Sequence, residues 1–142
     1  MRANFRRRAS KRQLGVHHNL ESLYQKVRST HFADFPIDCI VRWGRLPAPA
    51  KKPRNSVRLG GYIVQTRTVT VHPVLDQVWV PSLFVEFILY HEMLHQKHDI
   101  PVVAGRNVYH TDAFRADEKR FPQFAEMIKW ECDNLNRLLR SY

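Results

Sequence analysis

One short segment has the residue types and the spacing of a hydrolytic metal site. His91 and His95 are four positions apart and Glu92 follows the first of them, which gives the pattern His-Glu-x-x-His. On an α-helix, residues four positions apart lie on one face about one turn apart, so both imidazoles can bind the same zinc ion. Glu92 points toward the same edge and can take a proton from a water that the metal activates. The motif therefore predicts a zinc site with Glu92 as the general base.

The alternative interpretation is a core helix whose two histidines are hydrogen-bonded to their neighbours. Apolar residues surround the motif and predict that the helix is buried: Phe84, Phe87, Ile88, Leu89, Met93 and Leu94. Two imidazoles and a carboxylate are costly to bury unless something pairs with them. The metal site is therefore the favoured interpretation.

A catalytic zinc site usually has three protein ligands and one open position. His98 lies about 10.5 Å in rise from His91, at 1.5 Å per residue, which is too far for one ion to reach both. The longer zinc motif His-Glu-x-x-His-x-x-Gly-x-x-His would need a glycine at position 98 and a histidine at position 101. This motif is excluded, because His98 and Pro101 occupy those positions. His110 is the preferred third ligand, since the intervening loop can fold the chain back to the helix. Glu118, on a helix further along, is the main alternative.

The hydrophobic pattern predicts an α+β fold around this motif. Four helices are expected, over residues 19–30, 81–98, 111–121 and 122–140. Three strands are expected, over residues 37–43, 56–65 and 67–72. The last two strands are expected to form an antiparallel hairpin that turns near Thr66, and residues 99–110 are expected to form a loop. The final helix is expected to bury one side in the core: Phe124, Ile128, Cys132, Leu135, Leu138 and Leu139.

Length and composition predict a single domain without a membrane partner. The chain has 142 residues, 44% of them hydrophobic, which suffices for a proper core. No run of 18 apolar residues exists, so no membrane span is expected. Cys39 and Cys132 are isolated, so neither a zinc ribbon nor a disulfide framework is expected. This cysteine usage suits a reducing cytoplasm.

The formal net charge of +10 is concentrated in two segments. Residues 1–16 are expected to be a flexible basic arm that precedes a domain of residues 17–142, and residues 44–54 are expected to be an exposed loop. The basic residues singled out in these segments are Arg6, Arg7, Arg8, Lys11, Arg12, Lys51, Lys52 and Arg54. Such a charge favours contact with a polyanion, most simply nucleic acid, and the alternative is a solubilising tail.

The chain resembles the SprT-like zinc metallopeptidases in three features: the His-Glu-x-x-His motif, the 15-residue step from His95 to His110, and Phe114 four residues later. This family includes the Spartan proteases, which digest proteins crosslinked to DNA. The resemblance covers roughly residues 37–140 and includes three upstream segments that are similar to bacterial members: Trp43-Gly44-Arg45, Arg58-Leu59-Gly60-Gly61-Tyr62 and Val71-His72-Pro73.

The resemblance implies one zinc ion per chain, bound by His91, His95 and His110, with Glu92 as the catalytic base. It implies a zincin-like domain in which a small sheet, partly antiparallel, packs against a central zinc helix, with further helices at both ends. The implied substrate is a protein or peptide, with proteins bound or crosslinked to single-stranded or damaged DNA as a further expectation. The implied location is the bacterial cytoplasm or nucleoid.

The chain departs from the family pattern beside the third histidine, where Tyr109 and Thr111 stand and many members have a glycine. It also carries neither a cysteine-rich zinc ribbon nor Spartan's partner-binding motifs. DNA targeting would therefore depend on the basic arm and the basic loop alone.

Further site residues and two rival functions remain open. The candidates for an oxyanion donor are Tyr109, Arg106 and Tyr62, and Asp112 or Asp99 could orient a ligand histidine. One rival is a nucleic-acid-binding protein with a structural or vestigial zinc site, which the net charge supports. The other is a zinc hydrolase that acts on something other than protein. A base at the position of Glu92 favours an enzyme, and a strand edge beside the zinc helix could bind an extended peptide as another strand.

Overall fold

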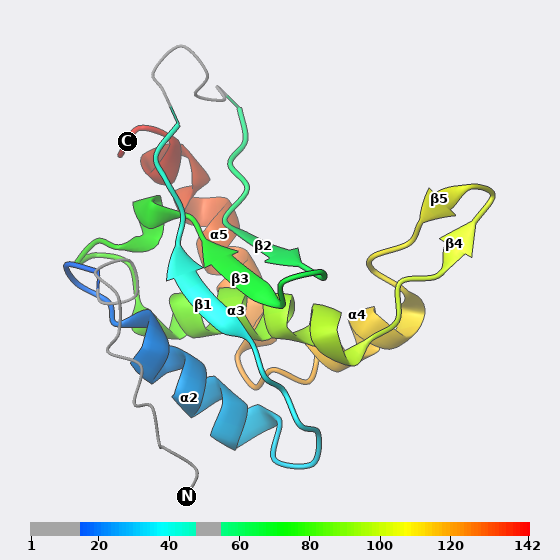
Figure 1. Cartoon of the computed structure of the whole chain (residues 1–142). Coiled ribbons are helices and arrows are strands. Elements are labelled where there is room, and N and C mark those ends of the chain that lie inside the picture. Colours follow the sequence, from blue (N-terminus) through cyan, green and yellow to red (C-terminus); the bar gives the residue numbers. More distant parts are fainter. Residues whose placement is uncertain (1–14, 48–54) are drawn as a thin grey trace, which may run out of the picture.

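The computed structural model describes residues 15–47 and 55–142 (Figure 1). The described residues form an α+β fold, as expected, with four α-helices, a three-stranded mixed sheet and a separate two-stranded hairpin. The elements in chain order are α2 (Leu20–His31), β1 (Ile40–Trp43), β2 (Gly60–Ile63), β3 (Thr68–Val71), the 3-10 helix η2 (Pro73–Leu75), α3 (Ser82–Lys97), β4 (Val102–Val103), β5 (Arg106–Asn107), α4 (Asp112–Glu118) and α5 (Phe124–Leu139).

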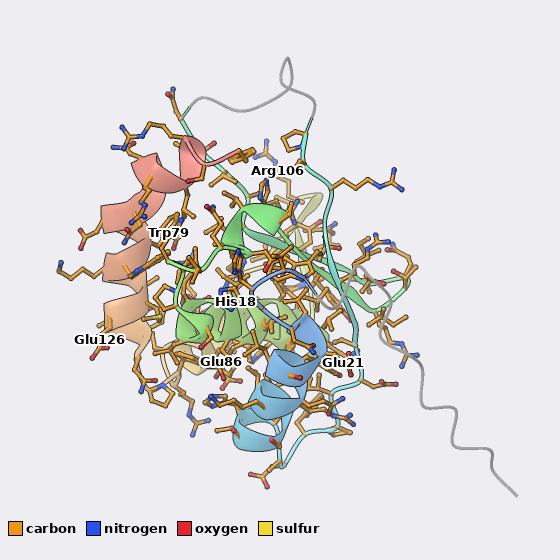
Figure 2. All side chains as sticks on the ribbon, turned by 90° about the vertical axis from the view of Figure 1, so that its left-hand side faces the viewer. His18, Glu21, Trp79, Glu86, Arg106 and Glu126 are labelled. Atoms are coloured by element: carbon orange, nitrogen blue, oxygen red, sulfur yellow. The ribbon has the colours of Figure 1, made fainter. Side chains whose placement is uncertain are left out.

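The helix that carries the motif, α3, is the buried centre of the fold. It runs behind the three-stranded sheet in Figure 1, and it contacts α2, α4, α5, β2 and β3. Ten of its 16 residues are buried, so its apolar side chains face neighbours in every direction. Glu86, the one buried carboxylate in its first half (labelled in Figure 2), pairs with Lys26 of α2 at 3.0 Å. The expected central buried helix is confirmed.

The sheet has the order β1-β3-β2. The expected antiparallel hairpin is confirmed as β2 and β3, with Ile63 opposite Thr68. β1 pairs with the other side of β3 in parallel. Val41, Val69 and Val71 are fully buried in the core that the sheet shares with α3. β2 is therefore an edge strand, and it lies against the motif-bearing helix.

Three expectations differ from the structure. The strands expected over residues 37–43 and 56–65 are shorter, because only Ile40–Trp43 and Gly60–Ile63 pair regularly with β3. The loop expected over residues 99–110 contains the β4–β5 hairpin, which projects from the body in Figure 1. Two-residue strands are too short to give a periodic signal. On α5, Cys132 is exposed and Ile128 is 38% exposed, because helical periodicity identifies a face but not how much of it a neighbour covers.

The segment before α2 is attached to the loop that follows η2. The Asp76 carboxylate accepts hydrogen bonds from the backbone N–H groups of Val16, His17 and His18, at 2.6, 2.8 and 2.9 Å. The last residue of the expected arm is thus held by the domain, and residues 1–14 lie outside the described part. Among the residues described, no helix is both long and apolar enough to cross a membrane.

Candidate metal centre

α3 places the two motif histidines on either side of the Glu92 carboxylate. One carboxylate oxygen lies 4.0 Å from Nε2 of His91, and the other lies 4.0 Å from Nε2 of His95. The two imidazole rings are 5.3 Å apart between centroids. The spacing predicted from the helical period is therefore present, and both Nε2 atoms face the same region as the carboxylate.

His110 joins this pair from a different segment of the chain. The β4–β5 hairpin reverses the chain after α3, and the ring of His110 lies 5.1 Å from each of the two motif rings. The side chain of Thr111 caps α4 by accepting a hydrogen bond from the Phe114 N–H at 3.2 Å. The fully buried Phe114 ring then contacts all three imidazoles, at 4.6 to 5.1 Å between centroids. Phe114 thus anchors the turn that carries His110.

The three histidines fit a zinc ion. Their ligand atoms all lie within 4.8 Å of one another, whereas ligand atoms around a tetrahedral zinc ion lie about 3.3 Å apart, so small side-chain rotations suffice. Zinc requires neutral imidazole. Burial, together with the nearby His91, lowers the pKa of His95 to about 4. Burial and the same neighbour also lower the pKa of His110. Both rings are therefore neutral and ready to donate a nitrogen.

Glu118, the alternative third ligand, contacts the outer nitrogen of a histidine instead. Its Oε2 is hydrogen-bonded to Nδ1 of His91, on the ring edge away from the Nε2 that faces Glu92. Burial lowers the pKa of His91, but the hydrogen bond to Glu118 and the charge of Glu92 outweigh burial, so the pKa is raised overall. A carboxylate on Nδ1 fixes the ring orientation and directs Nε2 toward a metal. Glu118 is accordingly not part of the three-residue group that could hold the ion.

Glu92 occupies a buried position beneath the edge strand. It is 6% exposed, and burial raises its pKa, with His91 and Arg58 opposing the shift. The backbone of Gly60 in β2 lies so close that a Cβ there would be 2.9 Å from Oε1 of Glu92. A carboxylate with a raised pKa, beside a metal site, is suited to accept and return a proton.

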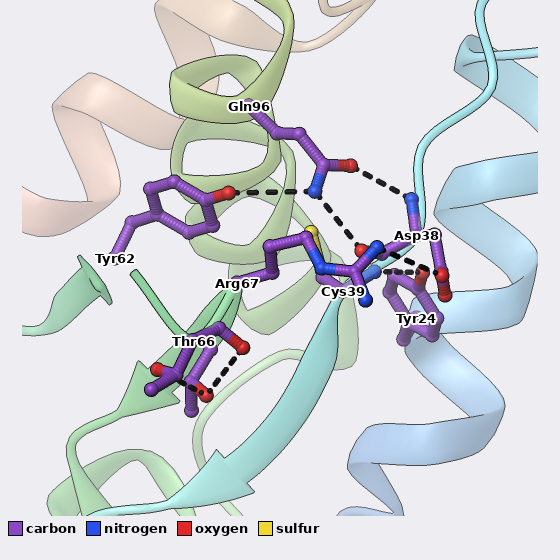
Figure 3. Close-up of polar contacts among 8 residues, drawn as sticks. Tyr24, Asp38, Cys39, Tyr62, Thr66, Arg67 and Gln96 are labelled. Atoms are coloured by element: carbon purple, nitrogen blue, oxygen red, sulfur yellow. Dashed lines mark hydrogen bonds and ion pairs between the residues drawn. The ribbon is translucent and has the colours of Figure 1, made fainter. Parts of the chain in front are cut away.

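A polar network that the sequence did not reveal lies beside His95, and Figure 3 shows its hydrogen bonds around Gln96. Gln96 accepts a hydrogen bond from the backbone N–H of Asp38 at 2.7 Å and donates to its carbonyl at 2.9 Å. The same amide donates to the Tyr62 hydroxyl at 3.4 Å. The Tyr62 ring is stacked against His95, with 12° between the ring planes. These hydrogen bonds thereby connect α3, the segment before β1 and the edge strand β2 next to His95.

A cleft of about 600 Å³ opens over the metal centre. Arg58, Gly60 and Tyr62 line it on the β2 side, and Ile128 and Glu131 line it on the α5 side. The charge of Arg58 lowers the pKa of Glu92, while burial raises the pKa of Glu131. Sequence reasoning missed Glu131, since nothing in the chain order relates α5 to the motif.

Of the remaining candidate site residues, some lie at the cleft and others lie away from it. Tyr109 is half-exposed and lines the cleft, whereas Arg106 lies on the exposed hairpin (Figure 2) and is not among the lining residues. Asp112 is the exposed first residue of α4 and is not the carboxylate that contacts a ligand histidine. His98, excluded as a ligand, pairs with Asp117 at 2.9 Å. All eight candidate nucleic-acid-binding residues lie outside the described residues: Arg6, Arg7, Arg8, Lys11, Arg12, Lys51, Lys52 and Arg54.

Comparisons with protein-family models, with curated proteins and with solved structures found no match for this chain. Function is therefore inferred from the site itself.

Proposed function

We propose that the protein is a zinc-dependent metallopeptidase of the SprT-like type. The observation that carries this proposal is the convergence of His91, His95 and His110 beside the buried carboxylate of Glu92, at the floor of an open cleft. A zinc ion held by the three imidazoles would supply Lewis acidity, which lowers the pKa of water and polarises a carbonyl group. Glu92 accepts the proton of the attacking water and delivers it to the leaving amine.

The position of β2 favours a peptide over a small molecule as substrate. Within the described part of the chain, β2 pairs with β3 alone, so its second edge is available for hydrogen bonds. This strand packs on α3 near Glu92, where a Cβ at Gly60 would lie 2.9 Å from the carboxylate. An extended peptide that pairs with this edge would lie across the catalytic base. A sheet edge above a zinc helix is also the arrangement expected of a zincin-like fold.

The proposed substrates of the whole protein are DNA-bound or DNA-crosslinked proteins. The support is the net charge of +10 together with the resemblance of the motif region to SprT-like proteins. The competing proposal is a nucleic-acid-binding protein with a structural or vestigial zinc site. Glu92 favours the enzyme, because a structural site has no use for a buried base in an open cleft.

Removal and return of the metal tests this function. The purified protein is stripped with a chelator, and cleavage of an unfolded protein substrate is followed before and after addition of zinc. We expect activity to disappear with the metal and to return at one zinc ion per chain. Substitution of His110 by Ala should prevent the return. Cleavage that persists in the stripped protein would contradict the proposal.

A further inference from the structure

The α5 wall of the cleft combines apolar side chains with one carboxylate. Ile128 and Glu131 are three positions apart and so lie on one face of α5, about one turn from each other. Both line the cleft, together with Phe87 of α3. The Phe87 ring lies 5.8 Å from that of Phe124, which precedes Ile128 by one turn on the same helix face. This part of the cleft is thus an apolar recess with a carboxylate on its wall.

The carboxylate of Glu131 has no cationic partner among the described residues. Two other carboxylates that are not exposed differ in this respect, since Glu118 contacts His91 and Glu86 contacts Lys26. Burial raises the pKa of Glu131, the charge of Glu118 adds to the shift, and His91 opposes it. Within residues 15–47 and 55–142, no lysine or arginine forms an ion pair with Glu131. A partly desolvated carboxylate without a partner is unfavourable, and a cation placed beside it would be stabilised.

We propose that Phe87, Ile128 and Glu131 form a subsite for a lysine or arginine side chain of the substrate peptide. This inference rests on the proposed peptidase function and names a preference of the same site. The aliphatic stem of the basic residue would lie against Ile128, beside the buried Phe87 ring, and its charged end would pair with Glu131. Arg58 lies on the β2 wall and repels a cation there, so the preference belongs to the α5 side alone.

The subsite agrees with the substrates considered above. Proteins that bind nucleic acid carry basic segments, because these segments neutralise phosphates. A cleft that selects lysine or arginine next to the cleaved bond would therefore act preferentially on such proteins. The preference would be a property of the cleft itself and would not require DNA to be present.

Cleavage-site mapping tests the preference. The zinc-loaded protein digests a peptide library, and mass spectrometry determines the residues that flank each cleaved bond. We expect lysine or arginine at one fixed position beside the bond. Matched peptides with arginine or norleucine at that position should differ in kcat/KM by about ten- to a hundredfold, which is the range for a hydrogen bond to a charged group.

Substitutions on α5 separate the subsite from general effects of charge. Glu131→Gln should bring the arginine-to-norleucine ratio close to one, and Glu131→Arg should favour a peptide with glutamate at that position. Glu126→Gln makes the same charge change on an exposed part of the same helix (Figure 2) and should keep the wild-type ratio. An unchanged ratio in Glu131→Gln would overturn the subsite.

Binding supplies a readout that does not depend on turnover. Fluorescence anisotropy in the Glu92→Gln background should show tighter binding of the arginine peptide than of the norleucine peptide, and this difference should vanish when Glu131→Gln is added. A protein that cleaves without a basic preference overturns the subsite alone. A protein that neither cleaves nor binds any of the peptides overturns the proposed function, and the subsite with it.

Discussion

His91 uses its two ring nitrogens for two different contacts. Nε2 faces the Glu92 carboxylate and the other ligand histidines, while Nδ1 is hydrogen-bonded to Glu118 of α4. Because the outer contact fixes the tautomer, the ring is oriented for a metal before any ion binds. Glu118 is in this sense a positioning residue, and its effect should appear in the zinc affinity.

Glu118→Gln should lower the affinity for zinc by about 10- to 100-fold, the usual effect of removing an outer partner of a ligand histidine. Competition with a chromophoric chelator measures this affinity directly. Asp112→Asn, an equal change of charge at the exposed start of the same helix, should leave the affinity unchanged. Equal affinities of wild type and Glu118→Gln would remove the positioning role.

Sequence reasoning named the three candidate ligands, which the structure brings together, but did not identify every residue that surrounds them. The spacing of His91 and His95 fixed their common face through the helical period, and His110 was preferred over Glu118 because a loop could return it to the helix. The structure groups these three histidines and gives Glu118 a different contact. Glu131 could not be assigned, because its place in the cleft depends on how α5 packs against α3.

At the scale of elements, the packing of β2 on α3 limits the space around the Glu92 carboxylate. A Cβ at Gly60 would lie 2.9 Å from both Oε1 of Glu92 and Cγ2 of Ile88. A Cβ at Gly61 would meet nothing closer than 3.5 Å, where Arg58 lies. A side chain therefore fits at Gly61 without displacing a neighbour, whereas at Gly60 it does not.

Gly60→Ala should displace the Glu92 carboxylate or lift β2 from α3, and should lower kcat about ten- to a hundredfold, since small displacements of a catalytic group are costly. Zinc content should remain at one ion per chain. Gly61→Ala is the control and should keep most of the activity. Equal kcat values for the two variants would show that the contact at Gly60 does not constrain the base.

Asp76 offers a separate test of how the N-terminal segment is attached. Burial raises the pKa of its carboxyl, but three backbone N–H donors outweigh burial and lower the pKa overall. A lowered folded pKa stabilises the fold above the unfolded carboxyl pKa of about 4, and this stabilisation is lost as the pH falls through the folded value.

Asp76→Asn should therefore lower the free energy of unfolding at pH 7 by about 1–3 kcal/mol. The difference from wild type should shrink as the pH falls below about 4 toward the lowered folded pKa, at which the folded wild-type carboxylate itself becomes protonated. Urea unfolding at pH 7 and pH 3 measures both values. Asp133→Asn, in an exposed ion pair with Lys129, should change stability by less than about 0.5 kcal/mol. A difference for Asp76→Asn that grows as the pH falls would contradict this account.

Strand pairing was predictable only for strands that are close together in the sequence. β2 and β3 are separated by a short turn at Val64–Arg67, so their antiparallel pairing followed from two β-rich runs around Thr66. β1 reaches β3 across a long connection, and residue types do not specify which strand it joins or in which direction. The β4–β5 hairpin, two residues in each strand, lies below the length at which periodicity is informative.

At the scale of the whole molecule, charge and catalysis are expected to occupy different parts of the chain. The net charge is +10, yet the candidate metal site consists of three histidines with the carboxylates of Glu92 and Glu118 beside them. The basic residues assigned to DNA lie in residues 1–12 and 51–54, away in sequence from the motif. DNA affinity and peptide cleavage should therefore be separable by substitution.

Neutralising the basic loop should weaken binding of single-stranded DNA and leave cleavage of a DNA-free peptide unchanged. The loop variant replaces three residues by glutamine: Lys51, Lys52 and Arg54. The slope of log K against log salt should decrease by about 2, because each phosphate that the protein no longer neutralises lowers it by about 0.7.

A control variant removes the same charge from exposed positions near the C-terminal end: Lys119, Lys129 and Arg140. Fluorescence titration at several salt concentrations compares the two. Identical slopes for the loop variant and the control would mean that net charge alone attracts DNA, without a defined contact at the loop.

The most direct test of the central claim is a paired measurement of zinc content and cleavage rate for wild type and Glu92→Gln. The substitution preserves shape but removes the base, so both proteins should hold one zinc ion per chain bound by His91, His95 and His110. Cleavage of an unfolded protein should fall by at least about a hundredfold in the variant, as expected for loss of a general base. Cleavage by Glu92→Gln at the wild-type rate would contradict the role of Glu92. A zinc-loaded wild type that cleaves no peptide under any condition would contradict the peptidase itself.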